Sequence, residues 1–295
     1  MLGTASGDRN IIGPAGMESL SNCLAVNTTL TSLKLDANSI ALRGMRSLAP
    51  GLHLNTSLRS LDLSSNGLKN KAIKLLSDTL AVGGLTSLDL SRNQISDEGA
   101  NFLADALKGD NILQSLCLDF NDIEGPGGQA LGLGLKSNTR LTSLSMCHNK
   151  LGSAGLSGLA EMFPIVAPSP TKAGGNDTEG SFCIMEILKL SNNSISNEGA
   201  NLLFNRLRDN FTLKTLDLSQ NAISQHAARE IGSCLRSNCC LTSLNLSMNK
   251  LHSLGVSMIS SGLELNTTLK KLFLRDVNMK DECVGQLAVS LRSGG

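Results

Sequence analysis

One pattern recurs along this chain at a nearly constant spacing and constrains its fold more than any other feature. The pattern is Leu-x-x-Leu-x-Leu-x-x-Asn-x-Ile/Leu, in which x is any residue and Met replaces Leu in two places. A ninth copy at Leu269 has Val277 in place of the asparagine. The steps between copies are of 28 residues, except for one of 27 and one of 44. The eight full copies begin at Leu30, Leu58, Leu85, Leu113, Leu141, Met185, Leu213 and Leu241. The chain is therefore a tandem array of one short unit.

Each unit predicts one short strand followed by one helix. Leucines at positions 1, 4 and 6 of the pattern suit the buried side of a strand, and the small polar residues between them suit its exposed side. The helix is clearest at residues 96–107, where Leu103 and Leu107 lie one turn apart and Asp97 and Glu98 suit its first turn. Neither element can bury its apolar face alone, so the units must stack. We predict an α/β solenoid of about nine units, a horseshoe with parallel strands on its concave face and helices on its convex face.

Two asparagines in each unit have predicted structural roles. The asparagine at position 9 lies where the chain leaves the strand, and its amide can satisfy backbone groups that the turn leaves unpaired. We expect these asparagines to form a ladder. A second asparagine lies three residues before the leucine at position 1 of the following unit. We expect it to end the helix in the left-handed conformation. It occurs at Asn27, Asn55, Asn138, Asn210, Asn238 and Asn266.

The spacing also predicts the organisation of the chain. We expect residues 1–295 to form a single domain of repeats, with 1–29 as a degenerate N-terminal unit. The step of 44 residues is longer than the usual 28, so the fifth repeat contains extra residues. The segment 164–182 within it is rich in Pro, Gly and Ser. We predict that this segment is a flexible insertion. Ser169 within it precedes a proline and is a candidate site for phosphorylation.

Composition and charge exclude several classes of partner. The 26 Lys and Arg nearly balance 25 Asp and Glu, and cations occur at most in pairs. We therefore expect no nucleic acid partner. The longest apolar stretch falls far short of the roughly 20 residues that cross a bilayer, and the first residues do not resemble a signal peptide. We expect no membrane contact and a cytoplasmic protein.

The eight cysteines are spaced irregularly, so we predict that they are reduced thiols. Cys23 and Cys234 occupy the helical slot that holds Ala106 in another unit, which predicts that both are small core residues. Cys117, Asp119, Cys147 and His148 fall on adjacent predicted strands and combine a thiol, a carboxylate and an imidazole. An open sheet offers such groups no pocket that excludes water. We expect no catalysis, no metal, no cofactor and no small-molecule substrate.

A glycine motif at residues 125–130 fits the fingerprint of dinucleotide-binding proteins. Gly127 within it recurs at the same offset from the asparagine in other units, for example as Gly99 and Gly155. We interpret it as a turn glycine of the repeat rather than as part of a phosphate-binding loop.

The candidate binding residues are those that the repeat places on the concave face, at positions 3, 5, 7 and 8. Trp and Tyr are absent from the chain, although binding hot spots favour them together with Arg. The remaining anchors are charged, aromatic or sulfur-bearing side chains. The predicted partner-binding residues are Asp62, Asp89, Arg92, Asp119, Phe120, His148, Met248, Phe273 and Arg275.

Residues 27–35 and 88–100 resemble the ribonuclease-inhibitor-like subfamily of leucine-rich repeats. The array is similar to those of NOD-like receptors and of the Ran GTPase-activating protein. The resemblance implies a horseshoe that binds other proteins through its concave face or rim loops. We therefore expect a non-enzymatic protein-protein interaction scaffold. Two alternatives remain open: a GTPase-activating protein or regulator of a small GTPase, and a structural subunit of a large assembly such as an axoneme.

Overall fold

A computed structural model describes residues 10–80, 83–109, 111–164 and 183–293, in which helices and short strands alternate. The strands are β1 (Ser32–Lys34), β2 (Ser60–Asp62), β3 (Ser87–Asp89), β4 (Ser115–Cys117), β5 (Ser143–Ser145), β6 (Ile187–Lys189), β7 (Thr215–Asp217), β8 (Ser243–Asn245) and β9 (Lys271–Phe273). The helices are α1 (Pro14–Val26), α2 (Ala41–Leu54), α3 (Lys69–Leu80), α4 (Asp97–Leu107), α5 (Gly125–Leu135), α6 (Gly152–Ala160), α7 (Asn197–Leu207), α8 (Gln225–Ser237), α9 (His252–Leu263) and α10 (Asp281–Ser293).

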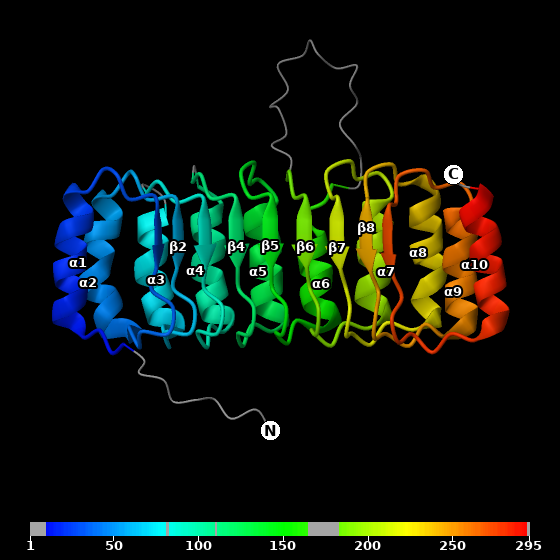
Figure 1. Cartoon of the computed structure of the whole chain (residues 1–295), viewed down its shortest axis with the longest axis horizontal. Coiled ribbons are helices and arrows are strands. Elements are labelled where there is room, and N and C mark those ends of the chain that lie inside the picture. The colour runs from blue at the N-terminus through cyan, green and yellow to red at the C-terminus, as the bar shows by residue number, and fades with distance from the viewer. Residues whose placement is uncertain (1–9, 81–82, 110, 165–182, 294–295) are drawn as a thin grey trace, which may run out of the picture.

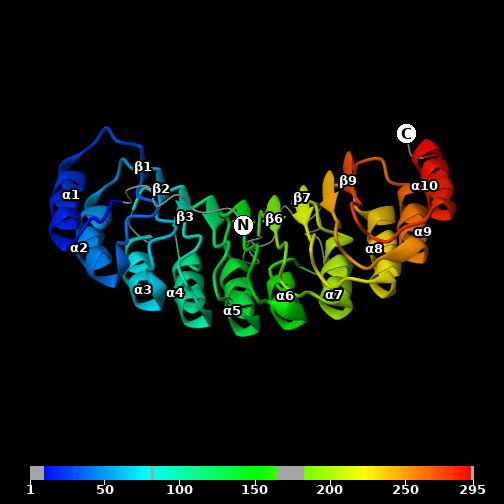
Figure 2. The same cartoon turned by 60° about the horizontal axis from the view of Figure 1, so that its bottom comes forward.

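The strands form one parallel sheet in the order of the chain, β1 to β9. Neighbouring strands pair in repeat register, so that Leu61 lies opposite Leu88 and Asp62 opposite Asp89. The helices stand in a second layer behind the sheet (Figure 1). Seen from another side, the strands follow the inner curve of an arc and the helices follow its outer curve (Figure 2). The predicted leucine-rich-repeat solenoid is confirmed.

The core between the two layers consists mainly of leucine. Leu88 and Leu90 of one unit are at most 1% exposed, and among the described residues the only fully buried large aromatic side chains are those of Phe163 and Phe204. Cys234 is fully buried as predicted, but Cys23 is exposed, so its prediction is wrong. The reason is its position in the stack: α8 packs between α7 and α9, whereas α2 is the one described helix against which α1 packs.

The predicted asparagine ladder is confirmed, and from Asn66 to Asn249 it joins each unit to the one before it. The fully buried Asn93 accepts hydrogen bonds through Oδ1 from the backbone N–H groups of Asn66 and Leu68 (3.0 and 3.2 Å). Its Nδ2 donates to the backbone oxygens of Leu63 and Leu90 (2.9 and 3.0 Å). With the oxygen of Ser91 (3.2 Å), one amide thus bonds five backbone groups, three of which belong to the preceding unit.

The second asparagine caps the helix in three of the six units, as Asn27, Asn55 and Asn238, and in none of the six does it have the predicted left-handed conformation. Asn55 has φ −80° and ψ 122°, which is extended rather than left-handed. Its Oδ1 accepts from the N–H of Leu58 (2.7 Å), and its Nδ2 donates to the oxygens of Leu24 and Asn27 in the preceding unit (2.7 and 3.0 Å). The residue is therefore selected for its side-chain amide, which forms a second ladder along the helix ends.

The repeat glycine also has a different role from the predicted one. Gly127 lies in the first turn of α5, and a Cβ there would fall 2.5 Å from Oδ1 of Asp97 and 2.6 Å from Cγ2 of Ile123. It permits the close approach of neighbouring units rather than forming a turn. Residues 165–182, with Ser169, lie outside the described residues. The single domain over 1–295, the N-terminal unit over 1–29 and the insertion over 164–182 stay predictions.

We expect Asn93→Ala to lower the free energy of unfolding by about 2–4 kcal/mol, because it leaves several buried backbone groups without partners. Asn205→Ala is the matched control, since Asn205 lies exposed on α7, and we expect it to change stability by less than about 0.5 kcal/mol. Urea denaturation followed by circular dichroism measures both. Equal losses in the two variants would contradict the ladder's role.

Candidate functional site

Position 8 of each unit forms a column of left-handed residues at the end of the strands. All nine have φ between 54° and 59°, a conformation that costs roughly 1–2 kcal/mol for residues other than glycine. Backbone hydrogen bonds hold it in place, as where the N–H of Phe120 donates to the oxygen of Cys147 in the next unit (2.8 Å). The column consists of Ala37, Ser65, Arg92, Phe120, His148, Asn192, Gln220, Met248 and Asp276. Their side chains are therefore presented in repeat register.

Four consecutive members of this column contact one another, and we name them the ring stack: Arg92, Phe120, His148 and Asn192. The guanidinium carbon of Arg92 lies 3.8 Å from the centre of the Phe120 ring. The rings of Phe120 and His148 stack with centres 4.0 Å apart and planes 7° from parallel. Nδ1 of His148 lies 2.8 Å from the amide nitrogen of Asn192, which can only donate, so Nδ1 accepts this bond.

The ring stack is both ordered by its own contacts and open to solvent. Phe120 is 40% exposed, and Arg92 and Asn192 are also exposed. A flat arginine and aromatic surface that is already stacked loses little side-chain freedom when a partner covers it. Of its four members, the sequence prediction missed Asn192, and the signal that could have found it is its place in the same column.

The predicted carboxylates serve the backbone as well as the surface. Oδ1 of Asp62 accepts from the N–H of Ser64 (2.9 Å), and Asp89 does the same for Ser91 (2.8 Å). Both are half-buried. These bonds close the turn after each strand, so aspartate at position 5 has a structural reason independent of any partner.

Asp119 bridges two units instead of facing a partner freely. Its Oδ1 accepts from the hydroxyl of Ser145 and from the N–H of Cys147, both at 2.7 Å. Its carboxylate therefore lies against the strand ends beside the ring stack.

The remaining predicted residues form a separate group near the other end of the concave face: Met248, Phe273 and Arg275. Met248 and Phe273 are 45% and 48% exposed. The N–H of Met248 donates to the oxygen of Arg275 (2.7 Å), which places these two residues on adjacent units. Gln220 lies between this group and the ring stack and contacts the sulfur of Met248 through Nε2 (3.3 Å).

The thiols on the concave face are poor nucleophiles in this setting. Burial raises the pKa of Cys117 to about 12, and the charges of Asp119 and Asp89 add to the effect. Burial, followed by the charge of Asp119, also raises the pKa of Cys147. Nδ1 of His148 faces Asn192. A protonated thiol does not attack an electrophile readily, so the arrangement does not favour catalysis by these groups.

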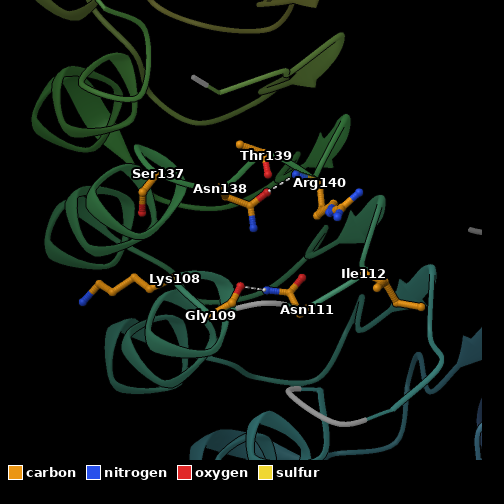
Figure 3. A pocket seen from close by; sticks show the side chains of 8 residues that line it. All are labelled: Lys108, Gly109, Asn111, Ile112, Ser137, Asn138, Thr139 and Arg140. Atoms are coloured by element: carbon orange, nitrogen blue, oxygen red, sulfur yellow. Dashed lines mark hydrogen bonds between the residues drawn. The ribbon is translucent and has the colours of Figure 1, made fainter. Parts of the chain in front are cut away.

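A hollow of about 400 Å³ opens where α4 and α5 lead into their next strands (Figure 3). Its asparagines are engaged in local turns: Asn138 accepts from the N–H of Arg140 (2.9 Å), and Asn111 donates to the oxygen of Gly109 (3.1 Å). Its polar groups therefore serve the fold. Across the residues that the structure describes, no group of three His, Cys, Asp or Glu side chains is placed to hold a metal ion.

Comparison with known families identifies the class of protein. The leucine-rich repeat family model matches residues 26–49, 54–77, 85–104, 110–132, 137–160, 183–204, 209–228 and 237–260. The chain therefore belongs to the leucine-rich repeat family, whose members serve in general as protein-interaction scaffolds. A comparison with curated proteins gives no match. Among the described helices, none has the length and apolar character needed to cross a membrane.

One solved structure supports the fold, and two others are similar at lower scores. A chain of the TLR13–ssRNA13 complex aligns with a TM-score of 0.51 and 21% identity over 92% of this chain and 36% of its own length. A chain of the yeast Rad7–Elc1 complex aligns at 0.48 and 18% identity over 94% of this chain and 70% of its own. Actin-binding site 2 of leiomodin-1 aligns at 0.32 and 27% identity over 33% of this chain and 57% of its own.

We expect the cysteines to separate into two classes when the native protein is treated with iodoacetamide at pH 8. Cys23 and Cys239 are exposed and should be alkylated quickly. Cys117 and Cys234 each have a pKa raised to about 12 by burial, so only about one thiol in ten thousand is ionised. They should react after denaturation, as peptide mass spectrometry can show. Rapid native alkylation of Cys117 would contradict the inert-thiol interpretation.

Proposed function

We propose that this protein is a non-enzymatic scaffold that binds a protein partner through its concave face, with the ring stack at the centre of the contact. The observation that carries the proposal is the continuous stack of three planar groups, Arg92, Phe120 and His148, on neighbouring units. Arginine and aromatic side chains dominate the binding energy of protein interfaces. Here Arg92 and Phe120 are exposed and His148 is half-buried, and the three side chains are adjacent and held in one conformation.

The rest of the concave face supports a broad and shallow contact. Position 3 is serine in the units of Arg92, Phe120 and His148, so in these units its side chain is small and leaves the approach to the ring stack open. Met248, Phe273 and Arg275 offer a second exposed apolar and cationic group on the same face. Two separated anchors on one curved sheet suit a folded partner better than a small molecule. No feature of the described residues favours GTPase activation or an axonemal role over this function.

The test compares two triple variants on the same column. In the first, Arg92→Ala, Phe120→Ala and His148→Ala remove the ring stack. In the control, Ser65→Ala, Gln220→Ala and Asp276→Ala make the same change at other left-handed residues of position 8. Partners captured from native lysate by the wild type are identified, produced in pure form and measured by biolayer interferometry.

We expect the ring-stack variant to weaken partner binding by at least about thirtyfold, because a single hot-spot residue contributes about 2 kcal/mol or more. The control should bind within about twofold of the wild type. Both variants must melt at similar temperatures for the comparison to stand. Undiminished binding by the ring-stack variant would contradict the proposal.

A further inference from the structure

Positive charge gathers on two neighbouring helices although the chain as a whole is nearly neutral. Helices α2 and α3 together carry five Lys or Arg and a single acid, Asp78. Neither helix has an acidic residue in its first turn, whereas α4 begins with Asp97 and Glu98. The five cations are Arg43, Arg46, Lys69, Lys71 and Lys74. Helices α2 and α3 belong to the outer layer of the arc (Figure 2).

A groove runs through this patch. Two hollows of about 530 and 380 Å³ adjoin one another across α2, α3 and the start of α4, and both are lined by Leu42, Lys71 and Glu98. Their other lining residues include Lys69 in the first hollow and Leu75 in the second. We name this feature the basic groove and define it by Leu42, Arg46, Lys69, Lys71, Lys74 and Phe102.

The cations of the basic groove are not neutralised by the part of the chain that the structure describes. None of the four has a carboxylate within 4.0 Å there, in contrast to pairs elsewhere such as Lys214 with Glu186 (2.6 Å). The one acid of the groove, Glu98, accepts a hydrogen bond from Nδ2 of Asn70 (3.0 Å). Nζ of Lys74 lies 5.6 Å from the centre of the Phe102 ring. The groove therefore combines uncompensated positive charge with an accessible aromatic face.

The apolar floor of the groove departs from the structural pattern of the repeat. Four residues after the ladder asparagine, several units place a polar side chain that bridges to the next unit. Asp97 accepts from the N–H of Glu124, and Asn197 accepts from that of Ser224, both at 2.8 Å. The first unit places the half-buried Leu42 there instead. Leucine cannot make this bridge, so it leaves apolar surface where other units have a hydrogen bond.

We propose that the basic groove binds an acidic peptide segment of a protein partner, with carboxylates facing the four cations and apolar side chains entering between Leu42 and Phe102. The positive charge of the groove favours an acidic ligand. Its apolar floor favours a peptide, because a peptide can bear apolar side chains as well as carboxylates. A polynucleotide carries phosphate at every step but no aliphatic group to fill the hollows. A flat anionic membrane cannot follow a recessed floor. This site is distinct from the ring stack, and its function does not depend on the concave face.

The experiment selects random dodecapeptides displayed on phage against the intact protein and then measures the enriched peptides by fluorescence polarisation. The groove variant is Arg46→Glu, Lys71→Glu and Lys74→Glu. The matched control is Lys136→Glu, Arg229→Glu and Arg236→Glu, which makes the same change in charge at exposed cations of other helices. It includes both arginines of a hollow of about 550 Å³ between α8 and α9. A third variant, Phe102→Ser, keeps the charge of the groove and removes its aromatic face.

We expect enriched peptides that combine Asp or Glu with Leu or Phe, and affinity that falls at least about tenfold in the groove variant and clearly in Phe102→Ser. The control should stay within about twofold, and all variants should melt like the wild type. Failure to find any acidic peptide that distinguishes the groove variant from the wild type overturns the proposal. So does groove-dependent binding of phosphatidylserine vesicles or of an oligouridine RNA without peptide binding.

Discussion

A buried side-chain amide is the interaction on which this structure depends. Each unit makes a sharp turn after its strand, and the turn leaves backbone groups that neither strand nor helix can satisfy. The ladder asparagine of the next unit supplies both the acceptor and the donors, as Asn93 does for the unit that contains Asn66. Leucine can then fill the space between sheet and helices without a large aromatic core, because polar groups near that space have partners.

The ladder also determines how the concave face is displayed. The residue just before each ladder asparagine is left-handed, and its N–H bonds to the following unit, as His148 does to Ser191 (2.8 Å). Backbone conformation is therefore repeated, while the side chain at this position varies. Planar groups in three successive units stack because the scaffold brings them into register, and the same scaffold carries serine or alanine in the first two units. Binding chemistry can thus change along the column with little change in the fold.

Much of this architecture follows from the sequence, since spacing alone reveals the units, the strands and the ladder. The sequence also places Arg92, Phe120 and His148 in one column. It does not reveal their face-to-face contact, which depends on rotamers and on the left-handed backbone. The extended conformation of Asn55 was missed because its side-chain hydrogen bonds decide it. The exposure of Cys23 was missed because it depends on the number of units that pack against its helix. The basic groove was missed because it joins side chains from three helices of different units.

The hydrogen bonds of the ladder have a direction. From Asn66 to Asn249, the asparagine of one unit completes the turn of the unit before it, as Asn249 does at Ile223. A shortened array made by deleting units from the C-terminal side would therefore end in a turn with unsatisfied buried N–H groups. Within the turn, deletion from the N-terminal side would instead free the asparagine side-chain amide and backbone oxygens such as that of Asn66, which water can solvate. Truncation from the C-terminal side and truncation from the N-terminal side are therefore not equivalent. Arrays rebuilt from these units need a designed cap mainly at their C-terminal end.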